Sequence, residues 1–135
     1  EPFYLAVQED DGLARRRRVS LEDVHDEPML LLEEGHCLRD QSLAFCERED
    51  VEPNVVFQGS SLQSILNLIR TGFGYTFVPA MVKRSSPAEG ITFVPFDRPS
   101  PRRDLVLLRR TSSPTSQVDE LFNDFVRDWC RSMND

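Results

Sequence analysis

Cys37 and Cys46 are the residues of this chain best suited to redox chemistry. After its first residue, the stretch from position 35 to 50 contains no glycine or proline and is rich in helix formers, which predicts a helix beginning near Cys37 or Leu38. Unpaired backbone N–H groups and the positive end of the helix dipole favour a thiolate there, the reactive form of cysteine. His36 and Arg39 add cationic or hydrogen-bond-donating groups nearby. Cys37 is therefore predicted to be a nucleophile.

The spacing of the two cysteines predicts that they can pair only if the helix changes shape. Nine residues of continuous helix correspond to about 13.5 Å of rise and about two and a half turns, so the two sulfurs lie on opposite faces. A disulfide needs Cα atoms within about 7 Å of each other. A disulfide that closes so short a loop stabilises the chain by only roughly 2–3 kcal/mol, because it restrains few residues of the unfolded chain. Melting two helical turns costs a comparable free energy, so the bond would be labile and reversible. The alternative is that both cysteines are ordinary buried apolar residues.

The other elements follow from hydrophobic periodicity and turn residues. A helix with a capping-box pattern at Ser60–Gln63 should end at Gly72, and apolar residues spaced from Val118 to Trp129 predict an amphipathic terminal helix. One capped helical turn is predicted at 19–24. Strands are predicted at 3–7, 29–32, 54–58, 75–79, 91–94 and 104–109. Alternating strands and helices indicate an α/β fold with a mixed, mostly parallel sheet flanked by helices.

Composition narrows the class of protein. The formal net charge is −7, which disfavours direct binding to nucleic acid, and acidic residues flank the basic run 15–18, which predicts a solvated loop there. The 3 cysteines and 2 histidines lack the spacing of a zinc site, so we expect no metal. The apolar runs are far shorter than the roughly 20 residues that span a bilayer. We therefore expect a cytosolic protein that does not bind membranes.

Three segments resemble one family. The string Gly-His-Cys-Leu-Arg-Asp-Gln at 35–41, followed by a cysteine at 46, resembles the GHCLRDQ…C signature of the OxyR family, the LysR-type transcription regulators of bacteria that sense hydrogen peroxide. Residues 72–80 resemble the Gly-x-Gly-Ile-Thr-Leu-Leu-Pro-Ala segment of LysR-type regulators, and 101–103 resemble the family's Pro-Arg-Arg. The resemblance covers essentially the whole chain. It corresponds to the latter half of the family's proteins, so we expect a DNA-binding domain and a first regulatory subdomain before Glu1.

The resemblance implies a fold and an organisation into two parts. The fold is that of regulatory subdomain II of a LysR-type regulator, which is similar to periplasmic binding proteins. Residues 1–103 would form the redox-sensing subdomain, and residues 104–135 a strand and helix that return to the first subdomain. Tyr75 and Phe77 stand where the family usually has aliphatic residues, and Cys130 is an additional cysteine that we expect to be a bystander. An apolar terminal helix without its usual neighbour would favour self-association.

The resemblance also implies the roles of individual residues. Cys37 would be oxidised by hydrogen peroxide to a sulfenic acid, and Cys46 would then complete a reversible disulfide that changes conformation and the activation of antioxidant genes. His36, Arg39 and Arg103 match positions that line the sensing pocket. The family's pocket also uses hydroxyl side chains from the first subdomain.

The partners implied are hydrogen peroxide, a second copy in a homodimer or tetramer, and thiol reductants such as glutaredoxin or thioredoxin. DNA and RNA polymerase would be contacted only by the full-length protein. Neither a cofactor nor enzymatic turnover is expected, because nothing resembles a peroxiredoxin or glutathione-peroxidase signature. The alternative is an ordinary LysR-type effector domain, in which Ser60 and Ser61 at a helix N-terminus would help to bind a small anionic metabolite.

Overall fold

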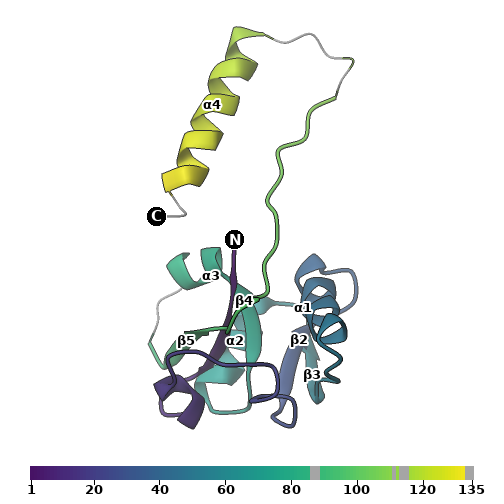
Figure 1. Ribbon diagram of the computed structural model, residues 1–135, viewed down its shortest axis with the longest axis vertical. Coiled ribbons are helices and arrows are strands. Elements are labelled where there is room, and N and C mark those ends of the chain that lie inside the picture. Colours follow the sequence, from purple (N-terminus) through teal and green to yellow (C-terminus); the bar gives the residue numbers. More distant parts are fainter. Residues whose placement is uncertain (86–88, 111, 113–115, 133–135) are drawn as a thin grey trace. The chain divides into compact units, whose positions relative to one another are not determined.

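The computed structural model (Figure 1) describes residues 1–85, 89–110, 112 and 116–132. The chain divides into two units, Glu1–Arg103 and Asp104–Asp135. The first unit contains β1 (Phe3–Gln8), the 3-10 helix η1 (Gly12–Arg15), β2 (Met29–Leu32), α1 (Cys37–Arg48), β3 (Val55–Gly59), α2 (Leu62–Arg70), β4 (Thr76–Pro79), α3 (Ala80–Ser85) and β5 (Ile91–Pro95). The second unit contains α4 (Gln117–Ser132).

Two sheets form the framework of the first unit. β1 is the central strand of a sheet with the order β4-β1-β5, in which Leu5 lies opposite Phe77 on one side and Val94 on the other. β2 and β3 form a second, parallel pair. A bridge between Met29 and Tyr75 links the start of β2 to the residue before β4. α1 connects β2 to β3 within the parallel pair, and α2 leads from β3 to β4 in the other sheet.

The described part of the sheets is less parallel than the sequence predicted. β4 and β5 run in the same direction and are joined through α3, as alternation of strands and helices implies. β1, however, lies between them and pairs antiparallel with each. The prediction of a mostly parallel sheet was wrong because periodicity identifies strands but contains no information about their direction or their neighbours.

Both faces of the central strands are buried, in two separate apolar clusters. Alternate residues of β1 and β2 point to opposite faces, as the pleat requires: Leu5 and Leu31 belong to the larger cluster, and Ala6 and Leu30 to the smaller one. α2 covers the smaller cluster with Ile65, Leu66 and Ile69. α1 contributes Phe45 and Cys46 to the larger cluster.

Three local predictions need correction. Residues 104–109 form no strand, because the chain has no ladder partner there and the side chains of 105–108 are exposed. Residues 22–26 form turns, and no helix is assigned within 19–24, although the Ser20 N–H does donate to Asp23 Oδ2 at 2.8 Å. Ser61, rather than Ser60, caps α2, and it does so without a side-chain hydrogen bond, so the capping box is not formed.

The other predicted helices and strands lie within two residues of their predicted limits at most ends, whereas η1 and α3 were not predicted. Gly72 does terminate α2, with φ of 77°. α4 begins and ends close to the predicted limits and displays an exposed apolar stripe. That stripe consists of Val118, Leu121, Phe122, Phe125 and Trp129.

Candidate functional site

The predicted nucleophile lies at the start of α1. Cys37 is the first residue of the helix, is exposed, and has a free thiol. The preceding His36 is the N-cap residue with an extended backbone, and its side chain makes no capping hydrogen bond. Gly35 adopts a φ of 90°, a conformation that glycine reaches easily, and so lets the chain turn into the helix. The helix start predicted from the sequence is confirmed.

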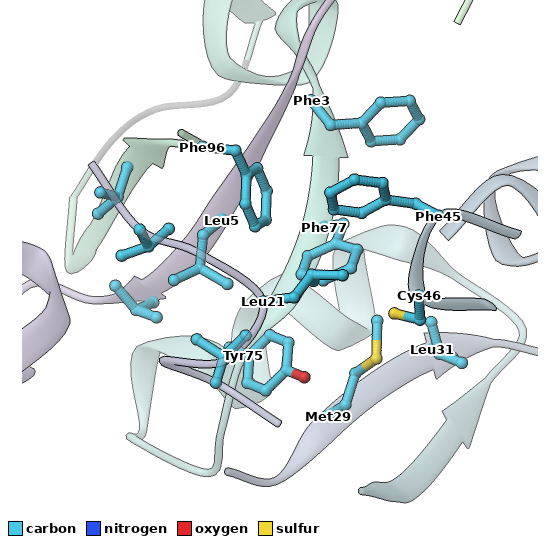
Figure 2. Close-up of a cluster of buried hydrophobic side chains, with 14 residues drawn as sticks. Phe3, Leu5, Leu21, Met29, Leu31, Phe45, Cys46, Tyr75, Phe77 and Phe96 are labelled. Carbon is cyan, nitrogen blue, oxygen red and sulfur yellow. The ribbon is translucent and has the colours of Figure 1, made fainter. Parts of the chain in front are cut away.

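The second cysteine occupies the opposite environment. Cys46 is 2% exposed and belongs to the larger apolar cluster, where Figure 2 shows its sulfur directed inward near Met29 and Leu31. Burial raises the pKa of the Cys46 thiol to about 11, because the apolar surroundings disfavour a thiolate. Cys46 is therefore a neutral thiol at physiological pH and is shielded from solvent.

Helix α1 keeps the two sulfurs apart. It is continuous from Cys37 to Arg48, so the nine-residue separation corresponds to about 13.5 Å along the axis. One cysteine faces solvent and the other faces the core, and both are free thiols. A bond between them is impossible in this conformation and requires part of the helix to leave its place.

An aromatic cluster next to Cys46 was not anticipated from the sequence. The ring of Phe45 packs edge-on against Phe77, with centroids 6.1 Å apart, and against Phe96, at 5.6 Å. Phe77 and Phe96 are themselves in contact at 5.0 Å, and Figure 2 shows Phe3 on the other side of the Phe45 ring. The apolar run at 43–46 was a signal that this part of the helix is buried, but it does not identify the partners of the phenylalanine ring.

Arg39 lies in the first turn of α1, two residues after Cys37. Its side chain is 20% exposed, and its guanidinium makes a long ion pair with Asp40 at 3.6 Å. Its Nε is buried without a hydrogen-bond partner, and so is Oε1 of Gln41. Unsatisfied buried polar groups are costly and occur often where a ligand or water completes the bonding. Arg39 therefore retains donor capacity beside the start of α1.

Arg103 has its partners elsewhere. Its guanidinium contacts Glu1 Oε1 at 2.6 and 2.7 Å, and both side chains are largely buried. The other carboxylate oxygen of Glu1 accepts from the Met81 N–H at the start of α3, at 2.8 Å. The structure thus joins Arg103 to the first residue and to α3, and a role for it in a pocket around Cys37 stays a prediction.

Comparisons with known proteins identify the family of this chain. The family model described as the LysR substrate binding domain matches residues 1–131. The chain belongs to the LysR substrate-binding domain family. The hydrogen peroxide-inducible genes activator of Pectobacterium carotovorum is 36% identical over 129 residues, which cover 95% of this chain and 43% of that protein. The transcriptional regulator OxyR of Escherichia coli K12 is 35% identical and is matched over 94% of this chain and 42% of its own length.

Solved structures show the same LysR fold. The crystal structure of the reduced form of OxyR is 30% identical with a TM-score of 0.72, over 94% of this chain and 58% of that one. The LysR regulator HinK of Pseudomonas aeruginosa has a TM-score of 0.81 at 22% identity, over 96% of this chain and 45% of that one. The predicted α/β fold class and family are confirmed. The chain spans less than half the length of the curated relatives named above.

The alternative prediction, binding of a small anionic metabolite, concerns the N-terminus of α2. Ser60 is exposed, and Ser61 is half-buried with a side chain that forms no capping bond. Both serines directly precede Leu62, the first residue of α2. Binding of an anion by these two serines stays a prediction.

Within the described residues, no group of three or more histidine, cysteine or acidic side chains is placed to hold a metal ion. In the same part of the chain, no helix is both long enough and apolar enough to cross a membrane.

Proposed function

We propose that this chain is the redox-sensing part of a LysR-type transcription regulator, and that Cys37 and Cys46 form its reversible switch. One observation carries the proposal: a single continuous helix has an exposed thiol at its first residue and a second thiol buried in the core. Oxidation that links the two must disrupt the native packing. A chemical signal at the surface would thereby become a change of shape.

The first step is oxidation of Cys37 by hydrogen peroxide. The Cys37 thiolate attacks one peroxide oxygen, the O–O bond breaks, and the departing hydroxide takes a proton to become water. The sulfur is oxidised to a sulfenic acid while the peroxide is reduced. We propose that His36 and Arg39 donate hydrogen bonds to the thiolate and to the oxygens, for which Arg39 has an unpartnered Nε.

The second step is formation of the disulfide. The sulfur of Cys46 attacks the sulfenic sulfur of Cys37, the S–O bond breaks, and the oxygen leaves as water with the proton of the Cys46 thiol. Together the steps reduce one peroxide to two waters and oxidise two thiols to one disulfide. Since burial keeps Cys46 neutral, the attack must await local opening of α1. A thiol reductant such as glutaredoxin or thioredoxin would restore the dithiol.

The remaining parts of the proposal concern the longer protein. The change of shape would be passed to a homodimer or tetramer of regulatory domains, and from there to DNA and RNA polymerase. The names of the relatives, which are activators of hydrogen peroxide-inducible genes, support this role. Arg103 would join the sensing pocket only after its ion pair with Glu1 rearranged.

Peptide mapping by mass spectrometry tests the proposal directly. The chain is treated with sub-stoichiometric hydrogen peroxide alongside Cys37→Ser, Cys46→Ala and Cys130→Ser. We expect a Cys37–Cys46 link that forms in the parent and in Cys130→Ser, and a trappable sulfenic acid on Cys37 in Cys46→Ala. Unmodified Cys37, or equal oxidation of all three cysteines, would return the chain to the class of metabolite-binding LysR domains.

A further inference from the structure

We propose that Phe45 is a positioning residue that sets the redox threshold of the Cys37–Cys46 pair, because its ring holds α1 in the dithiol conformation. The inference rests on the proposed function. The inference adds to that function a residue that neither carries a thiol nor contacts the peroxide. The observation behind it is the packing of Phe45 beside Cys46 in the larger cluster.

Phe45 is the anchor of the second half of α1. It is 6% exposed, and its ring contacts Phe77 of β4 and Phe96 just after β5 through edge-on packing. Phe77 lies in β4 and Phe96 directly follows β5, so the ring ties the helix to the three-stranded sheet. The other two buried residues of α1 are small, Ser42 and Cys46. Within α1, Phe45 therefore buries the largest apolar side chain.

Formation of the disulfide should withdraw this ring. The Cα atoms of the two cysteines must approach from about 13.5 Å to within about 7 Å, and adjacent Cα atoms are only about 3.8 Å apart, so Phe45 moves when Cys46 moves. The opposite movement, in which Cys37 enters the core, requires space beside Cys46. A close-packed interior provides no room for an additional backbone segment.

The energetic consequence has a definite sign. The contacts of Phe45 stabilise the dithiol form and are lost in the disulfide form, so they oppose oxidation. Weakening these contacts destabilises the dithiol form and leaves the free energy of the disulfide form almost unchanged. The equilibrium then shifts toward the disulfide, and the reduction potential becomes more negative.

Titration of the pair in glutathione redox buffers measures this equilibrium. The variants Phe45→Leu and Ile69→Val are compared in a Cys130→Ser background; Ile69 is a fully buried residue of the smaller cluster, away from Phe45. Phe45→Leu should favour the disulfide about tenfold, which is about 30 mV for a two-electron couple. Ile69→Val should change the ratio less than twofold. Phe45→Met, whose flexible and unbranched side chain fills irregular space better than leucine, should shift the equilibrium in the same direction by a smaller factor.

Alkylation of the reduced chain provides a readout that needs no oxidant. Phe45→Leu should increase the rate at which N-ethylmaleimide modifies the buried Cys46 about tenfold relative to Ile69→Val, with little change at the exposed Cys37. If the disulfide forms in the parent but Phe45→Leu and Ile69→Val give the same potential, the inference is wrong and the proposed function survives. If the parent forms no such disulfide, both are overturned.

Discussion

Oxidation of the Cys37–Cys46 pair should fail to stabilise the chain, although it adds a cross-link. A closed loop of about ten residues lowers the entropy of the unfolded chain and by itself would add about 2.7 kcal/mol to the free energy of unfolding. Against this, the oxidised form loses the burial of Phe45 and Cys46, which are 6% and 2% exposed in the dithiol form. Burial of a phenylalanine side chain alone contributes about 1.5–3 kcal/mol. The two effects nearly cancel.

Urea unfolding followed by circular dichroism checks this expectation. The Cys130→Ser chain is measured in the dithiol form and after peroxide has formed the disulfide. We expect free energies of unfolding that agree within about 1 kcal/mol, with a smaller denaturant slope for the oxidised form because less surface is buried in its folded state. The Cys46→Ala variant, treated with peroxide in the same way, controls for other oxidation.

One result would refute the reasoning. If the disulfide form gains the full cross-link contribution with an unchanged denaturant slope, the native packing of Phe45 and Cys46 has survived oxidation. The helix would then have adapted without leaving the core. Oxidation would not be coupled to a large change of shape, and the switch would need another explanation.

Three further predictions follow from individual contacts. Burial raises the pKa of Cys46 from 9.0 to about 11, so between these pH values the folded dithiol chain binds more protons than the unfolded chain. Its free energy of unfolding should therefore be steady below pH 9 and fall by roughly 2–3 kcal/mol by pH 11. Urea titrations at several pH values measure this fall, which should be smaller in Cys46→Ala. Gly74→Ala places a Cβ 2.1 Å from the Pro28 carbonyl oxygen at a φ of 149°, so it should cost about 3 kcal/mol or more in the same assay, whereas Gly12→Ala, with open space around it, should cost under about 1 kcal/mol. Arg39→Ala removes a charged donor beside Cys37 and should slow sulfenic acid formation about tenfold in stopped-flow measurements, while Arg84→Ala, on the exposed end of α3, should leave the rate unchanged.

Local features of the sequence were sufficient to locate most elements and the chemistry of the candidate site. The run of helix formers after Gly35 predicted the start of α1 to within one residue, and the spacing to Cys46 placed the two thiols on opposite faces of the helix. These are properties of neighbouring residues and of helix geometry. For the same reason the apolar spacing in α2 and its terminal Gly72 were recognised correctly.

Local sequence patterns were insufficient to predict strand pairing and ion pairs between residues that are far apart along the chain. The segment 104–109 has strand-forming residues but no ladder, and β1 pairs antiparallel with both of its neighbours. Arg103 was assigned by its likeness to a family motif, yet it pairs with Glu1, 102 residues away. Such pairings depend on which segments of the chain meet in the folded protein. Residue type and periodicity do not give this information.

The sequence by itself thus determined where the thiols lie on their helix and that they cannot bond while it remains intact. Only the tertiary structure decided which face of that helix is buried, since this depends on the packing of Phe45 against Phe77 and Phe96 from distant strands. That packing buries Cys46 and leaves Cys37 in solvent. The physical reason is that burial is a property of the assembled core, whereas helical spacing is a property of the chain.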